Sequence, residues 1–157
     1  EKFGKRDAWA LTFVLGAPFS FKGKEEGPFF KLPVETIIAA CEAYPNNFAV
    51  LIAEILPLFR VLDDGKRQWT NVASEMLSRF GRRKDILDAF SINLGTGGWS
   101  GPTSSYLASF LPPLQELSAH PHSNVRRWAN EKASQIGRQL KHELAEEEES
   151  TVRRSLS

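Results

Sequence analysis

Residues 95–102, Gly-Thr-Gly-Gly-Trp-Ser-Gly-Pro, combine two kinds of residue that can bind a ligand. Glycine-rich loops bind phosphate through backbone amides, and an exposed tryptophan such as Trp99 can stack on a nucleobase or sugar. A phosphate loop, however, requires a preceding buried strand and a following lysine. No strand is predicted before residue 95, and no Lys or Arg occurs from Phe90 to Val125. We therefore interpret the loop as a connection between helices, in which Trp99 either packs inward or contacts a partner.

The dinucleotide-binding pattern Gly-x-Gly-x-x-Gly fits this loop no better than the phosphate loop does. Gly95 and Gly97 match its first two positions, but the third position is Ser100, and Gly101 lies one residue too late. Glycines at such a connection permit positive φ angles where the chain leaves one helix and enters another. We predict no bound cofactor at this loop.

A second candidate is a basic cluster, in which residues 60–84 hold seven Lys or Arg against three Asp or Glu. Cations favour the C-terminal end of a helix, so a solvated helix end accounts for the cluster. The alternative is a patch that binds the phosphates of DNA or RNA. A net charge of +1 over 157 residues provides no global field for such binding. The cluster comprises Arg79, Arg82, Arg83 and Lys84, and Arg126, Arg127 and Arg138 extend it if they share a face.

Residues typical of metal sites or catalysis are few. His120 and His122 bracket Pro121 and have no third ligand nearby in the sequence, so we predict turn histidines and no metal site. Asp63 and Asp64 are typical of a turn. The lone Cys41 excludes an internal disulfide and indicates a reducing cytoplasm, and its apolar surroundings predict a buried, inert thiol. We expect no catalytic constellation, and hence no enzyme.

The apolar residues recur with helical spacing, and no run alternates convincingly with the period of a strand. We predict an all-α fold of about seven helices, with one domain over residues 1–142. Residues 143–157 form a charged tail that either extends the last helix or is mobile. The phenylalanines of the loop after residue 15 are expected to pack on the core. The predicted helices are 6–15, 33–43, 48–58, 69–80, 82–94, 103–117 and 124–140, and the loop phenylalanines are Phe19, Phe21, Phe29 and Phe30.

The first twenty residues imitate a secretory signal, with basic residues, an apolar run and small residues near Ala17. The run is about ten residues, too short to cross a bilayer, so we interpret residues 6–15 as a core helix. Because the sequence does not begin with Met, we expect it to be a piece of a longer protein.

Residues 111–140 resemble a HEAT repeat unit. The first helix carries Leu111, Pro112, Leu114 and Leu117, a short turn follows at Pro121 and Asn124, and the second helix begins Val125-Arg126-x-x-Ala129. Its apolar stripe continues through Ala133, Ile136 and Leu140. One such pair cannot bury its stripe alone, so the resemblance implies neighbouring helices stacked as an α-solenoid or irregular array. The second proline at Pro113 and the bulk of Trp128 depart from the pattern.

Residues 89–149, with the Glu-rich segment at their end, are similar to the C-terminal helical region of large prokaryotic NTPase or effector proteins that defend against phage. This resemblance implies a region used for sensing or assembly, with the activity in another domain. We therefore expect a non-catalytic, cytoplasmic interaction or scaffold module that binds a protein partner or another domain, and no membrane. The alternative is a nucleic-acid-binding helical repeat. The candidate partner-binding residues are Trp99, Arg79, Arg82, Arg83, Lys84, Arg126 and Arg127.

Overall fold

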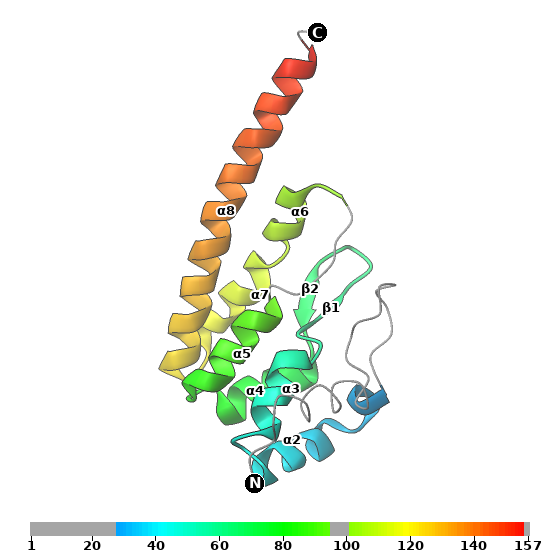
Figure 1. The fold of residues 1–157 in the computed structure, drawn as a ribbon, viewed down its shortest axis with the longest axis vertical. Coiled ribbons are helices and arrows are strands. Elements are labelled where there is room, and N and C mark those ends of the chain that lie inside the picture. The colour runs from blue at the N-terminus through cyan, green and yellow to red at the C-terminus, as the bar shows by residue number, and fades with distance from the viewer. Residues whose placement is uncertain (1–27, 95–100, 156–157) are drawn as a thin grey trace. The chain divides into compact units, whose positions relative to one another are not determined.

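The computed structural model describes residues 28–94 and 101–155, with side chains from 29 to 94 and from 101 to 152. This part of the chain is mostly helical, as predicted, and also contains one small β-hairpin (Figure 1). The chain divides into two compact units, residues 1–60 with 68–98 and residues 61–67 with 99–157. The predicted helix 6–15, Phe19, Phe21 and Trp99 lie outside the described residues. No described helix is long and apolar enough to cross a membrane.

Four α-helices and one 3-10 turn build the described part of the first unit. The helix α3 packs against α5, and α2 packs against both α3 and α4. Asn47 stands at the N-cap of α3, and its side chain makes no capping hydrogen bond. The helix α3 ends three residues before the predicted boundary at Leu58. The elements are η1 (Pro28–Lys31), α2 (Val34–Ala43), α3 (Phe48–Ile55), α4 (Asn71–Phe80) and α5 (Lys84–Leu94).

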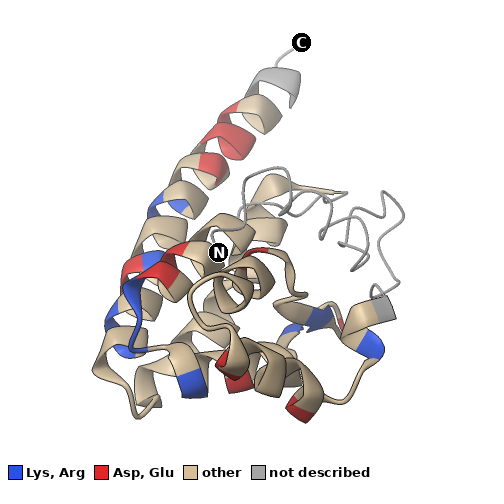
Figure 2. Cartoon of the chain, turned by 60° about the horizontal axis from the view of Figure 1, so that its bottom comes forward, with Lys and Arg blue, Asp and Glu red and all other residues tan. Residues whose placement is uncertain are grey.

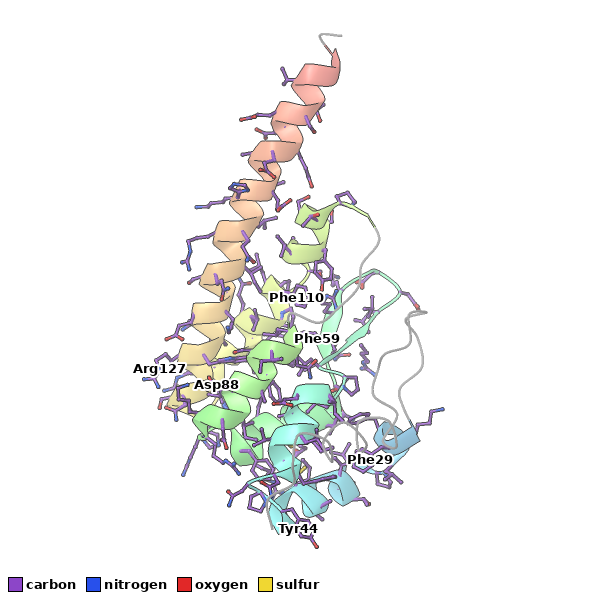
Figure 3. The ribbon with its side chains drawn as sticks, in the orientation of Figure 1. Phe29, Tyr44, Phe59, Asp88, Phe110 and Arg127 are labelled. Carbon is purple, nitrogen blue, oxygen red and sulfur yellow. The ribbon has the colours of Figure 1, made fainter. Side chains whose placement is uncertain are left out.

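The core of this unit consists of large apolar side chains from α2 to α5. Ile37, Ile52, Met76 and Phe90 are fully buried. Phe29 contacts both Phe30 and the first residue of α3 through edge-to-face rings, at centroid distances of 5.4 Å and 5.9 Å (Figure 3). The predicted attachment of the loop by its phenylalanines is therefore confirmed for the two that are described.

A two-stranded hairpin, β1 (Phe59–Val61) and β2 (Arg67–Trp69), stands where we expected only a turn. The turn itself is confirmed: Gly65 has a φ of 80°, and the backbone amide of Lys66 donates to the Asp64 carboxylate at 3.0 Å. Strands of three residues are too short to show an alternation of apolar and polar residues, so the sequence predicted neither β1 nor β2.

The hairpin corrects the start of the following helix. Trp69 belongs to β2, where its ring lies 4.4 Å from that of Phe59, rather than to the first turn of a helix. Thr70 caps α4 by accepting a hydrogen bond from the amide of Ala73 at 3.2 Å. Because Trp69 is buried on a strand, its helical spacing to Val72 and Ala73 was accidental.

The second unit contains α6 (Thr103–Ala108), α7 (Leu111–Glu116), the turn η2 (Leu117–Ala119) and α8 (Ser123–Ser155). The prediction of one continuous helix over residues 103–117 was wrong, because the chain breaks at residues 109–110. Pro112 and Pro113 lack the amide that a helix interior requires, and they fall instead in the first turn of α7, where no such donor is needed.

The last helix, α8, is 33 residues long and continues to Ser155, well past the predicted end at Leu140. It packs against α6, α7 and η2. Val125 and Ala129 of the predicted apolar stripe are fully buried, whereas Ile136 and Leu140 are half-buried. We predicted that residues 143–157 either extend the last helix or are mobile. The structure shows the helical extension for residues 143–155.

One contact ties this extension to the rest of the second unit. The carboxylate of Glu147 accepts hydrogen bonds from the hydroxyl of Ser104 at 2.8 Å and from its backbone amide at 3.4 Å. Ser104 lies in the first turn of α6 and is buried, so Glu147 satisfies donors that the helix itself leaves unpaired.

Candidate functional site

The predicted basic cluster is compensated by acidic side chains of the first unit. Arg79 forms ion pairs with Glu42 at 3.2 Å and with Glu75 at 3.6 Å. Lys84 forms an ion pair with Asp88, one turn along α5, at 2.6 Å. In Figure 2 the ribbon is coloured by residue type, and both acidic and basic residues occur along the helices; Asp88 is labelled in Figure 3. A phosphate group would have to compete with these partners.

Arg83 forms hydrogen bonds both to a carboxylate and to a backbone oxygen. Its guanidinium donates to both carboxylate oxygens of Asp85, at 3.0 Å and 2.6 Å, and to the backbone oxygen of Pro45 at 2.7 Å. The Arg83 hydrogen bonds are the main reason that the pKa of Asp85 is lowered. Arg82 is exposed and also takes part in an interaction. The structure therefore places Arg79, Arg83 and Lys84 within intramolecular networks.

A different set of polar residues gathers on the first half of α8. Each of the seven side chains lies three or four positions from another of the set, so they share one side of the helix. They line a shallow hollow, which we call the α8 basic face. Its residues are Ser123, Arg126, Arg127, Asn130, Glu131, Ser134 and Arg138.

The arginines of the α8 basic face differ in their contacts. Arg126 donates from Nη1 to the backbone oxygens of His120 at 2.7 Å and Pro121 at 2.9 Å, so it holds the turn before α8. Arg127 and Arg138 are exposed, and neither forms an ion pair with any side chain that the structure describes. Arg127 projects away from the helix in Figure 3. These two guanidinium groups are available to an anionic partner.

The histidine turn has a structural role. The backbone amide of His122 donates to Nδ1 of His120 at 3.1 Å, and the two ring centroids lie 5.3 Å apart. Burial of the ring, followed by the charges of His122 and Arg126, lowers the pKa of His120. Nδ1 of His120 therefore already accepts a hydrogen bond within the turn.

A possible cation site that sequence reasoning missed lies further along α8. His142, Glu143 and Glu146 each offer a ligand atom, and these atoms lie within 4.8 Å of one another. Nδ1 of His142 also lies 3.7 Å from the Glu146 carboxylate. The three come from one helix, and His142 and Glu146 are exposed, so they provide fewer ligands than the four of a structural zinc site. His142 and Glu146 are four residues apart in the sequence, and this spacing on a predicted helix is the signal that could have indicated the pair.

Comparisons with protein-family models, with curated proteins and with solved structures found no match to this chain. The site is therefore argued from its own geometry. Trp99, which the sequence offered as a binding residue, lies outside the described residues.

Arg67, at the start of β2, is half-buried and contacts three residues of the second unit. Its Nε donates to the hydroxyl of Ser109 at 2.7 Å, and its guanidinium carbon lies 4.2 Å from the ring centroid of Phe110 and 5.2 Å from that of Tyr106. Desolvation lowers the pKa of Arg67. The contact clamps the hairpin tip onto the break between α6 and α7, and no sequence spacing indicates it.

Cys41 is buried in α2, and burial raises the pKa of its thiol to about 12. Because the thiolate is the reactive form, we expect the folded protein to resist alkylation by iodoacetamide at pH 8 for hours. Mass spectrometry with and without urea checks this result. Modification at the same rate in both conditions would contradict the burial of the thiol.

Proposed function

We propose that this chain is a non-catalytic helical interaction module whose α8 basic face binds an acidic segment of a protein partner. The observation that carries the proposal is the state of Arg127 and Arg138. Both are exposed on one side of a helix and are not committed to an ion pair among the described residues. A partner carboxylate can therefore bind them without displacing an internal one, and arginine can hold a carboxylate through two parallel hydrogen bonds.

The same surface favours a protein partner over a nucleic acid. Binding to a DNA duplex normally neutralises several phosphates, because the backbone carries a charge about every 1.7 Å along the helix axis. The α8 basic face has three arginines, of which Arg126 already holds backbone oxygens, and it also contains Glu131. Beyond it, the glutamates of residues 143–149 would repel a phosphate backbone. A short acidic segment needs only the available pair.

The proposal that the module is not catalytic is supported by the contacts of its cysteine and of two of its histidines. The Cys41 thiol has a raised pKa, and His120 and His122 serve a turn. We further propose that α7, η2 and α8 correspond to the HEAT-like unit, on which helices of a longer chain stack. The packing of α8 on α7 and η2, with Val125 and Ala129 buried, supports this assignment. A sensing or assembly region of a cytoplasmic prokaryotic defence protein is the cellular role that the sequence resemblance suggests.

Fluorescence anisotropy with two labelled probes tests the proposal. One probe is a helical peptide of glutamate and alanine, and the other is a DNA duplex. We expect the unmodified protein to bind the peptide at low salt, and Arg127→Glu to weaken this binding about tenfold, equivalent to about 1.4 kcal/mol. Lys31→Glu, an exposed site in the first unit with the same change of charge, is the matched control and should retain affinity.

Two results would contradict the proposal. The first is a peptide affinity that Arg127→Glu leaves unchanged, or no peptide binding at low salt. The second is tighter binding of the duplex than of the peptide, with a steep salt dependence that Arg127→Glu reduces, which would favour the nucleic-acid alternative.

A further inference from the structure

Three charged residues of the α8 basic face form a stripe in which the sign of the charge alternates. Arg127, Glu131 and Arg138 are four and seven positions apart, and all three are exposed. These spacings keep the three side chains on one side of the helix. Glu131 lies about 6 Å along the helix axis from Arg127 and about 10 Å from Arg138, because an α-helix rises about 1.5 Å per residue. The stripe therefore presents positive, negative and positive charge at two unequal intervals.

The negative charge in this stripe restricts what the face can bind. Glu131 is the only acidic residue between positions 123 and 142 of the sequence. Neither it nor Arg127 nor Arg138 forms an ion pair with a side chain in the described ranges. A partner that presented carboxylates alone would place one of them against Glu131, where like charges repel. The partner that fits the stripe carries a basic residue between two acidic ones.

The stripe lies on the side of α8 that faces away from its packed side. Val125 and Ala129 are fully buried. Ala129 follows Arg127 by two positions, which is a turn of about 200° around the helix. Arg127 accordingly projects away from the helix in Figure 3, and the small side chain of Ser134, between Glu131 and Arg138, is exposed as well. A partner can therefore lie along this side of α8.

The intervals of the stripe favour a helical partner over an extended one. The two arginines are about 16 Å apart along the axis, which corresponds to about eleven residues of a helix or about five of an extended chain. Residues five apart in an extended chain point to opposite faces. In a helix, a residue and those seven and eleven positions after it all share one face. Only the helix can therefore present all three charges to the stripe.

The direction of the partner follows from the glutamates beyond the stripe. Five glutamates occur within residues 143–149, with no Lys or Arg before residue 153. The N-terminal end of a helix carries partial positive charge and the C-terminal end partial negative charge. A partner antiparallel to α8 that begins one or two turns before its first acidic residue places its N-terminal end beside these glutamates. A parallel partner would place its C-terminal end there, where the charges repel.

We propose that the acidic partner of the α8 basic face is an antiparallel helix with one charge order. It carries an acidic residue, a basic residue seven positions later, and a second acidic residue eleven positions after the first. In this register the three lie opposite Arg138, Glu131 and Arg127, in that order. Because this helix would occupy the surface of the proposed function, the proposal rests on that function and adds the charge order and direction that the surface selects.

Fluorescence anisotropy with two labelled peptides of identical composition tests this partner. Both are alanine-rich helices of about 20 residues, because shorter isolated helices are marginal in water, and both carry two glutamates eleven positions apart. A lysine follows the first glutamate by seven positions in peptide one and by four in peptide two. In the antiparallel register this lysine meets Glu131 in the first case and the uncharged Ser134 in the second. At about 20 mM NaCl we expect peptide one to bind about threefold more tightly, and the preference to disappear at about 500 mM.

A charge reversal in the protein provides the decisive arm. Glu131→Lys should reverse the preference, because the lysine of peptide one then faces another lysine. The ratio of the two affinities should change about tenfold, and any difference between the free peptides cancels in this comparison. Glu35→Lys, an exposed site of α2 with the same change of charge, is the matched control and should keep the original ratio. Circular dichroism shows whether each variant keeps its helices and whether each peptide is helical.

Three results would overturn this partner: equal binding of the two peptides, tighter binding of peptide two by the unmodified protein, or a ratio that Glu131→Lys leaves unchanged. If the peptides nevertheless bind and Arg127→Glu weakens them, the proposed function stands without the charge order. If neither peptide binds at low salt, or if Arg127→Glu changes neither affinity, the proposed function fails and the helical partner fails with it.

Discussion

Replacing Phe90 by alanine is expected to lower the free energy of unfolding by about 3–5 kcal/mol, the largest effect of any single change considered for this protein. Phe90 is fully buried on α5, the helix that packs against α3. Alanine removes most of the ring's buried surface and leaves a cavity that the surrounding helices fill only partly. Urea denaturation followed by circular dichroism measures the change.

Ile92→Ala is the matched control for Phe90, because the two residues share a helix. The Ile92 side chain leaves 59% of its surface exposed, so its truncation should change the stability by no more than about 0.5 kcal/mol. Equal losses for the two variants would contradict the burial pattern of α5, and a loss below about 1 kcal/mol for Phe90→Ala would contradict the core as described.

Replacing Arg67 by methionine is expected to lower the free energy of unfolding by about 2 kcal/mol, from a lost charge-assisted hydrogen bond and a lost cation–π contact. Methionine keeps the length of the side chain and much of its apolar packing. It cannot donate to Ser109 or place a cation over the rings of Tyr106 and Phe110. Urea denaturation gives the stability, and hydrogen exchange at the hairpin tip reports the local effect.

The control for Arg67 is Arg60→Met on the neighbouring strand. Arg60 is exposed and donates to Gln68, so its loss should cost no more than about 0.5 kcal/mol. Unchanged protection of the tip amides in Arg67→Met would show that the clamp does not hold the hairpin.

The helices were predictable because the information that specifies them is local. In α4, Val72, Met76 and Phe80 recur every four residues, and they form the buried side of the helix. The predicted end of this helix at residue 80 is confirmed, and Gly81 follows α4 as its C-cap. The helix α3 is apolar over nearly its whole length, and Leu51 and Ile52 are buried.

The hairpin and the break between α6 and α7 were not predicted, for two different reasons. A strand of three residues has too few positions for a period to appear, so β1 and β2 could not be distinguished from a loop. Pro112 and Pro113 were visible in the sequence, but we placed them inside one continuous helix over residues 103–117. Their missing amides instead make them the start of α7.

The contacts that decide the candidate site join residues far apart in the chain. Arg79 and Glu42 are 37 positions apart, and Arg67 and Ser109 are 42 apart. No local pattern shows the contacts of Arg79 with Glu42 or of Arg83 with Pro45, which the fold brings together. The other partners, Glu75, Asp85 and Asp88, lie within four residues of the cations that they pair with.

Arg126 and Arg127 show most directly how the two kinds of information divide. By itself, the sequence determined that both are arginines in the first turns of a helix with an apolar stripe. Only the tertiary structure decided their roles: Arg126 donates to the backbone oxygens of the preceding turn, and Arg127 is exposed. Neighbouring helical residues differ in direction by about 100°, and what each direction meets depends on elements that the local sequence does not specify.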